Sequence, residues 1–390
     1  MHHQVVVVGG GEAGLLVAGR LLRESPGLDV AIIEPSGHHD FQRMWLMVGS
    51  GVLRPDEARR DKGLLMPEEA TWIKNTVCSF DPHGSSLRID SGVTVTYDCL
   101  IVAPGLQMNW HLIPGLRESM GRDGVCSVYS HEVVATTWEF IRGFRGGVAL
   151  FTQPFAPIKS PYGSKEICFL AEEHFRESGV RDQSQVIFAS GAYGLFPIRQ
   201  YREVLEAIMA ERLIETRLGV ELIEVRGATK DAIFRDNRSG EVSVIGYDLL
   251  HVAPPMGPPD FIAQSELAGL GGWVDVDQYT LQHRRFSNVF GIGDASSLPA
   301  PKMGASIRYQ VAPLVANLLS LMEGRTLTAR YDGYTTCPIM TGYNSVLMAE
   351  YDYNGIVGDS HMRPLSSASS PVDLSIEHER RPAAYGLTGE

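Results

Sequence analysis

Residues 5–14 read VVVVGGGEAG, and the fold prediction starts from them. Four consecutive valines are typical of a parallel strand that is buried on both faces. Gly9, Gly11 and Gly14 then form the pattern G-x-G-x-x-G, and the largely apolar segment 15–22 follows as an expected helix. In this pattern the first glycine allows a tight turn, the second lets a pyrophosphate approach the backbone, and the third lets helix and strand pack. The stretch therefore predicts a dinucleotide-binding unit.

The next apolar run supports the same interpretation. Residues 30–33 read VAII, which predicts a second buried strand, and Glu34 follows it directly. An acidic residue at this place accepts hydrogen bonds from a ribose and suits a free 2′-hydroxyl group, not a 2′-phosphate. The helix N-terminus behind the glycines favours phosphate binding through its free N–H groups. We therefore assign Gly9, Gly11, Gly14 and Glu34 to cofactor binding.

Two later segments bear on the choice between FAD and NAD. Residues 97–105 (YDCLIVAPG) and 288–294 (NVFGIGD) each predict a buried strand that ends in a turn of small residues. In this order they resemble the flavoprotein disulfide-reductase superfamily, where the second segment places an Asp on the ribityl chain and pyrophosphate of FAD. The resemblance implies FAD as the cofactor. It adds four residues to the predicted cofactor site, namely Ala103, Gly105, Gly293 and Asp294.

The 390 residues are enough for two or three domains. Strand and helix patterns alternate again over 146–255, so we expect an α/β fold with two Rossmann-like dinucleotide-binding units and an aromatic-rich C-terminal segment. The predicted divisions are a first part of the FAD-binding domain (1–110), a connection (111–145), a second Rossmann-like domain (146–255), a second part of the FAD-binding domain (256–325), a C-terminal segment (326–357) and a polar, disordered or weakly ordered tail (358–390).

The second α/β unit lacks a phosphate-binding fingerprint. After its first strand the chain reads TQPF (152–155), without glycine. After its second strand it reads SGAYG (190–194), with two glycines at the wrong spacing. We therefore expect that electrons neither arrive from NAD(P)H nor leave to it.

Composition excludes several classes of function. The net charge of −12 argues against binding nucleic acid through its phosphates. Five cysteines are too few for a disulfide-stapled domain, and no pair has zinc-ligand spacing, so we expect no metal. No apolar run reaches the 18 or more residues that span a bilayer, and the early first strand leaves no room for a signal peptide. We expect a cytoplasmic protein with at most peripheral membrane contact.

Several further segments resemble the sulfide:quinone oxidoreductase family, in the branch that includes mitochondrial enzymes. They are 34–49 (EPSGHHDFQRMWLMVG), 157–160 (PIKS), 247–256 (YDLLHVAPPM), 272–277 (GWVDVD), 334–338 (YTTCP) and 341–344 (TGYN). The resemblance covers about residues 4–357. It implies that two cysteines beside the flavin form a disulfide, that sulfide attacks it, and that electrons pass through the flavin to a quinone. Attack on a disulfide requires a thiolate, and the flavin carries the electron transfer.

The sequence departs from this family at one of the two redox positions. Cys337 matches the C-terminal cysteine, but Ser160 stands where the other is expected. A hydroxyl group forms no disulfide and holds no persulfide. Three interpretations stay open: a substituted form of an ordinary enzyme, a divergent enzyme with Cys337 as its sole sulfur carrier, or replacement by another cysteine, Cys126 or Cys168.

Other features concern charge and the electron acceptor. A cation near the reactive sulfur or the flavin favours a thiolate and the charge of the reduced flavin, so we assign Lys159 to catalysis and Lys302 to cofactor binding. Arg308 stands where the resemblance implies small residues, and the tail shows no apolar stripe for a bilayer. We expect sulfide or a small thiol or persulfide as donor, and a quinone or another small molecule as acceptor. The alternatives are a soluble flavoenzyme with another substrate and a redox-silent, flavin-binding sulfur carrier.

Overall fold

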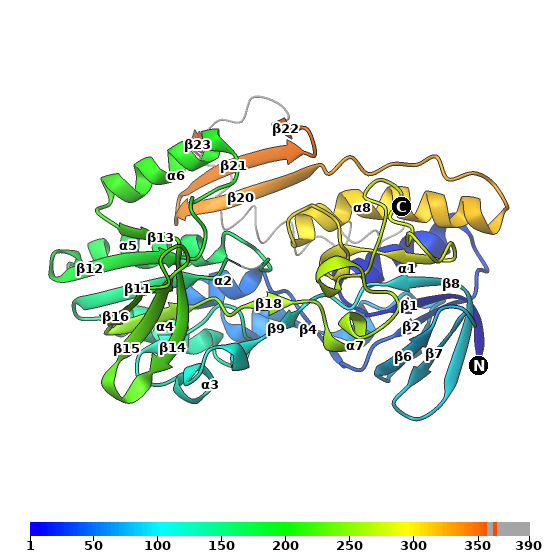
Figure 1. Ribbon diagram of the computed structural model, residues 1–390, viewed down its shortest axis with the longest axis horizontal. Helices are drawn as coiled ribbons and strands as arrows, with labels where there is room; N and C mark the ends of the chain where they lie inside the picture. Colours follow the sequence, from blue (N-terminus) through cyan, green and yellow to red (C-terminus); the bar gives the residue numbers. More distant parts are fainter. Residues whose placement is uncertain (156, 357–361, 365–390) are drawn as a thin grey trace.

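The computed structural model describes residues 1–155, 157–356 and 362–364. Two separate sheets carry the α/β fold, one in each half of the molecule in Figure 1. The first sheet has the order β5-β2-β1-β8-β7-β6, with β19 paired to β8. Its strands are β1 (His2–Val8), β2 (Val30–Ile33), β5 (Thr71–Ile73), β6 (Val77–Asp81), β7 (Ser86–Ile89), β8 (Thr94–Val102) and β19 (Val289–Gly291).

The predicted first unit forms the parallel centre of this sheet. Val5 pairs in register with Val30 of β2 on one side and with Cys99 of β8 on the other, and all four valines are buried. Helix α1 (Glu12–Glu24) follows the glycine loop and packs against α8 (Gly304–Met322). The α/β prediction for this region is confirmed, because buried strands and a glycine pattern are both local signals.

The second sheet is parallel throughout and has the order β10-β17-β11-β12-β13. A separate antiparallel sheet, β14-β15-β16, lies beside it in Figure 1. The helices and strands of this half are α3 (Leu116–Ser119), β10 (Val125–Cys126), α4 (Val134–Gly143), β11 (Gly147–Gln153), α5 (Gly163–Glu177), β12 (Ser184–Ser190), α6 (Arg199–Glu211), β13 (Glu215–Leu218), β14 (Val220–Arg226), β15 (Asp231–Asp236), β16 (Val242–Gly246) and β17 (Leu249–Val252).

The remaining short elements include the strands that cross between the two halves. They are β3 (His38–Asp40), α2 (Met44–Gly49), β4 (Arg59–Asp61), β9 (Gln107–Met108), β18 (Met256–Gly257) and α7 (Asp260–Ala263), with several single 3₁₀ turns. Strand β9 pairs with β18, so the two chain crossings between the halves run side by side.

The C-terminal segment forms a long antiparallel hairpin. Strands β20 (Thr335–Gly342) and β21 (Ser345–Asp352) extend from the end of the chain after α8 to the second half, where β20 packs on α5. Two short strands, β22 (Gly355–Ile356) and β23 (Met362–Pro364), pair with β21. Three residues of the predicted weakly ordered tail therefore form a strand, and the rest of 358–390 lies outside the described residues. In the parts of the chain that the structure describes, no helix combines the length and apolarity needed to cross a bilayer.

Candidate functional site

The three glycines of the first loop meet different surroundings. A Cβ atom at Gly9 (φ +102°) would lie 2.4 Å from the Ala103 carbonyl oxygen, and one at Gly14 would lie 1.9 Å from the Gly9 carbonyl oxygen. Both glycines are therefore required by close backbone packing. A Cβ atom at Gly11 would meet nothing within 4 Å. This open space before the N-terminus of α1 is what a pyrophosphate would need.

Glu34 is fixed at the carboxyl end of β2, facing the glycine loop. Its carboxylate accepts hydrogen bonds from the backbone N–H groups of Gly10 and Ser36, each at 2.8 Å. The buried ammonium of Lys62 lies 3.1 Å from the same carboxylate. Sequence reasoning missed Lys62, because it lies in a short turn outside every motif and reaches Glu34 only through tertiary packing.

Asp294 lies buried in the turn after β19, with one carboxylate oxygen engaged. Its Oδ2 atom is 2.6 Å from Nζ of Lys159. Its Oδ1 atom is buried and has no hydrogen-bond partner among the described residues. Buried polar atoms are almost always satisfied, so this oxygen indicates a missing donor such as a ligand hydroxyl. The residues present therefore fit FAD: Gly11 would hold the diphosphate, Glu34 a ribose and Asp294 the ribityl hydroxyls.

These groups open onto one cavity of about 560 Å³ between α1, α8 and the loop of Ser160. A ligand site of this size is ordinary for a protein. Eight of the predicted site residues line it: Gly9, Gly11, Glu34, Ala103, Gly105, Lys159, Ser160 and Asp294. The other five predicted site residues are not among its lining residues: Gly14, Cys126, Gly293, Lys302 and Cys337.

The Ser160 loop is held in a left-handed backbone conformation. Ser160 has φ +48°, which non-glycine residues adopt rarely. Its N–H donates to the carbonyl of Lys302 at 3.0 Å, and its carbonyl accepts from the Tyr129 hydroxyl at 3.2 Å. These bonds fix the loop at the cavity wall and compensate for the unfavourable backbone angle.

Lys302, which we predicted to bind the cofactor, is not among the residues that line the cavity. Its main chain supports Ser160, but its ammonium donates to the Ser296 carbonyl at 2.9 Å and lies 4.0 Å from the centre of the Trp273 ring. Burial lowers the pKa of Lys302 to about 8. The structure therefore does not bring this cation into the cavity, because the side chain packs on the indole face instead.

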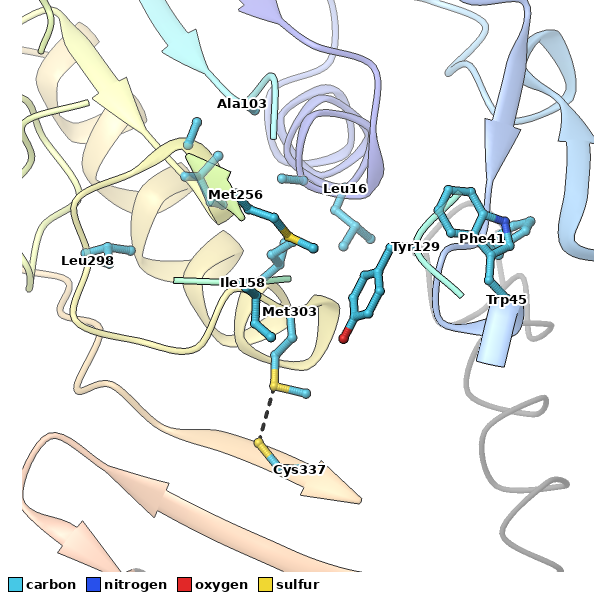
Figure 2. Close-up of a cluster of buried hydrophobic side chains, with 14 of the residues drawn as sticks. Leu16, Phe41, Trp45, Ala103, Tyr129, Ile158, Met256, Leu298, Met303 and Cys337 are labelled. Carbon is cyan, nitrogen blue, oxygen red and sulfur yellow. Dashed lines mark hydrogen bonds between the residues drawn. The ribbon is translucent and has the colours of Figure 1, made fainter. Parts of the chain in front are cut away.

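Cys337 lies behind the cavity wall on β20 and is fully buried. Its Sγ atom is 3.3 Å from Sδ of Met303, the residue before α8, which lines the cavity. Figure 2 shows this contact, with Tyr129 and Ile158 nearby. Burial raises the pKa of the Cys337 thiol to about 11. The thiol therefore contacts a residue that lines the cavity.

Two tyrosines connect Cys337 with the Ser160 loop. The Tyr351 hydroxyl lies 3.9 Å from the Cys337 sulfur and 3.0 Å from the hydroxyl of Tyr162. Because Tyr162 follows Ser160 by two residues, the two positions singled out in the sequence lie in one neighbourhood.

The remaining cysteines lie elsewhere. Cys126 pairs with His251 in the second sheet, and burial raises its pKa to about 12. Cys168 is buried on α5, where burial also raises its thiol pKa. Cys99 is buried in β8, and Cys78 is exposed. None of these four lines the cavity, and all five cysteines are free.

A pair of charged residues in the cavity wall completes the site. Glu12, in the fourth position of the glycine pattern, lies 3.8 Å from Nε of Arg308 on α8. Burial raises the pKa of Glu12. Sequence analysis singled out Arg308 but not Glu12, because the fourth position of the G-x-G-x-x-G pattern accepts any residue.

The matching place in the second α/β unit is filled by the chain itself. A Cβ atom at Gly191 would lie 2.0 Å from a Glu221 carboxylate oxygen, which also accepts from the Phe155 N–H. At the start of α5 the buried Lys165 ammonium donates to Gln153 at 2.7 Å. Protein side chains therefore occupy the ends of β11 and β12.

Comparisons with known proteins agree with this geometry. Residues 3–134 match the pyridine nucleotide-disulphide oxidoreductase family. The chain is 38% identical to the mitochondrial sulfide:quinone oxidoreductase of Mus musculus, over 90% of this chain and 78% of that protein. It is 37% identical to the protein of the same name from Dictyostelium discoideum, over 92% and 79%. The solved sulfide:quinone oxidoreductase of Aquifex aeolicus superposes with a TM-score of 0.76 at 18% identity, covering 93% of this chain and 85% of that one.

Proposed function

Since the chain belongs to the sulfide:quinone oxidoreductase family, we propose that it oxidises sulfide, or a small thiol or persulfide, with Cys337 as its sulfur-binding group. The observation that carries the proposal is the contact between the Cys337 thiol and Met303, a residue that lines the cavity that fits FAD. Persulfide formation from this thiol and sulfide is a two-electron oxidation that releases two protons, and bound FAD supplies the electron acceptor.

Of the three interpretations of Ser160, we favour the one in which Cys337 works alone. The Ser160 loop lines the cavity, and its hydroxyl cannot form an S–S bond. Cys126 and Cys168 are buried within other elements and are not lining residues. A single cysteine still forms a persulfide if the cofactor, and not a protein disulfide, takes the two electrons.

Neighbouring groups must stabilise the thiolate of Cys337, because burial favours the neutral thiol. The hydroxyl of Tyr351 and the cation of Arg43 both lower the pKa of Cys337, against the larger effect of burial. We infer that these two groups stabilise the thiolate once substrate or cofactor is present.

The proposed acceptor is a quinone, which the names of the relatives state for those proteins. Tyr309 is partly exposed at the cavity wall and offers an apolar ring where such a molecule would approach. Those relatives are mitochondrial by name, whereas we expected a cytoplasmic protein with at most peripheral membrane contact. That expectation stays a prediction.

The test is anaerobic addition of sulfide to the purified flavoprotein, followed by absorbance and by mass spectrometry of Cys337. We expect loss of the oxidised-flavin band and one added sulfur atom on Cys337. Cys337→Ser should keep its flavin oxidised, whereas Cys168→Ser, a matched change of a buried cysteine away from the cavity, should behave as the wild type. The proposal fails if FAD is bound and sulfide leaves the band unchanged, or if Cys337→Ser is reduced at the wild-type rate.

A further inference from the structure

The glycine loop of this chain carries an acidic residue where an anionic ligand is expected. Glu12 is the first residue of α1 and lines the cavity next to Gly11. An acidic side chain at a helix N-terminus interacts with the same partial positive charge that favours a phosphate. An ionised Glu12 would therefore oppose the diphosphate of FAD through like-charge repulsion at short range.

Arg308, on the facing helix α8, forms an ion pair with Glu12. Its Nε atom lies 3.8 Å from Oε1 of Glu12, and the two side chains are 21% and 22% exposed. Both residues line the cavity, so the pair faces the space of the cofactor. Gly304 makes room for the pair, because a Cβ atom there would lie 2.4 Å from Oε2 of Glu12.

Three other charged groups act on Glu12 from neighbouring elements. Lys159 and Arg43 favour its ionised form, and Asp294 disfavours it. Lys159 is already paired with Asp294 at 2.6 Å, and Arg43 donates to the carbonyl of Pro338 at 3.0 Å. Arg308 is the cation with the largest effect on Glu12, and it is the one whose pairing with Glu12 crosses from α8 to α1.

We propose that Arg308 is a positioning residue for FAD, which neutralises Glu12 so that the cofactor diphosphate can occupy the glycine loop. The proposal rests on FAD binding and not on sulfide chemistry, so measurements of FAD release without sulfide test it separately from the proposed reaction. If the ion pair served only to hold α1 and α8 together, loss of either partner would lower the stability of the protein to the same extent. The proposal requires opposite effects of the two residues on FAD.

The experiment compares the full-length holoprotein with Glu12→Gln, Arg308→Gln and the double variant. Free FAD fluorescence after serial dilution gives the dissociation constant of FAD. We expect Arg308→Gln to raise this constant about tenfold or more, because an unpaired carboxylate then faces the diphosphate. We expect Glu12→Gln to bind FAD at least as tightly as the wild type, and the double variant to lie within about threefold of it. Arg20→Gln is the matched control, since Arg20 forms an ion pair with Glu24 within α1.

Lowering the pH gives a second readout that a structural clamp would not produce. Protonation of Glu12 removes the repulsion, so Arg308→Gln should bind FAD more tightly as the pH is lowered, while the double variant shows no such recovery. The proposal is overturned if Arg308→Gln keeps wild-type affinity, or if the double variant binds as weakly as the single one. If Arg308→Gln does not fold, the FAD affinity of Glu12→Gln is the test. Binding at least as tight as that of the wild type supports the proposal, and weaker binding overturns it.

Discussion

The sulfur atoms of Met303 and Cys337 lie 3.3 Å apart, and only the former residue lines the cavity. Figure 2 shows the Met303 thioether between the Cys337 thiol and the buried side chains of Ile158 and Met256. Met303 is itself 4% exposed, so little of it is accessible to solvent from the cavity. We therefore expect the position of this flexible side chain to control the access of sulfur compounds to Cys337.

Shortening Met303 should open this path. We expect Met303→Ala to increase the alkylation rate of Cys337 by iodoacetamide at least about tenfold in the folded protein, because the truncation leaves a cavity beside the thiol. Met303→Leu conserves volume and should stay within about threefold of the wild type. Peptide mass spectrometry measures both rates, with the buried Cys168 as an internal reference for global unfolding. Equal rates in Met303→Ala and the wild type would show that the thiol is reached by another route.

The same labelling reaction should depend steeply on pH. Burial raises the pKa of Cys337 to about 11, so the thiol is protonated at neutral pH. Because only the thiolate reacts, the rate should rise about tenfold per pH unit while the pH stays below this value. Rates measured between about pH 7 and 9 check the slope. A plateau within this range would mean that the thiolate already predominates and that the neighbouring groups outweigh burial.

Local patterns predicted the first unit and its glycine loop, because strand, turn and helix follow one another within 34 residues. Side-chain direction was not predictable in the same way. Lys159 pairs with Asp294, 135 positions further along the chain, and the Lys302 ammonium lies over the Trp273 ring and not among the cavity-lining groups. Both contacts depend on tertiary packing.

Two glycine substitutions should separate folding from cofactor binding. Gly9→Ala would place a Cβ atom 2.4 Å from backbone at a φ of +102°, so we expect a lower melting temperature with or without FAD. The Cβ atom that Gly11→Ala adds has no neighbouring atom within 4 Å, so this variant should fold normally. Its methyl group would, however, occupy part of the proposed diphosphate position. We expect its FAD content after purification to fall at least about tenfold. Differential scanning fluorimetry and absorbance measure the two effects, and normal FAD content in Gly11→Ala would contradict the assignment of Gly11.

Acid should destabilise the protein partly through His251. Burial lowers the pKa of His251 to about 3, and its Nε2 atom accepts the N–H of Val128 at 3.1 Å. The folded state therefore keeps it neutral while the unfolded state binds a proton below about pH 6.5, so its contribution is complete above that pH and is lost as pH falls toward 3. His251→Gln, which keeps an acceptor but does not titrate, should reduce the pH slope of unfolding free energy by about 1.4 kcal/mol per pH unit. Urea unfolding between about pH 6.5 and 4.5 measures it, and identical slopes would contradict the shift.

Restoring a thiol at position 160 should rebuild the two-cysteine arrangement that the family resemblance implies. The Ser160 loop is fixed by main-chain bonds that do not involve its hydroxyl, so Ser160→Cys should fold with the same backbone. The tyrosine pair places this loop near Cys337, and we expect a disulfide between the two positions in the oxidised variant. The wild type has five cysteines, and the variant has one more. Because a disulfide removes two thiols, titration of the denatured, oxidised variant should find one thiol fewer than the five of the wild type. Ser164→Cys, at a buried serine on α5, is the matched control and should add one thiol. One additional thiol in oxidised Ser160→Cys would mean that the loop and β20 are too far apart for bonding, and that this scaffold is built for one cysteine.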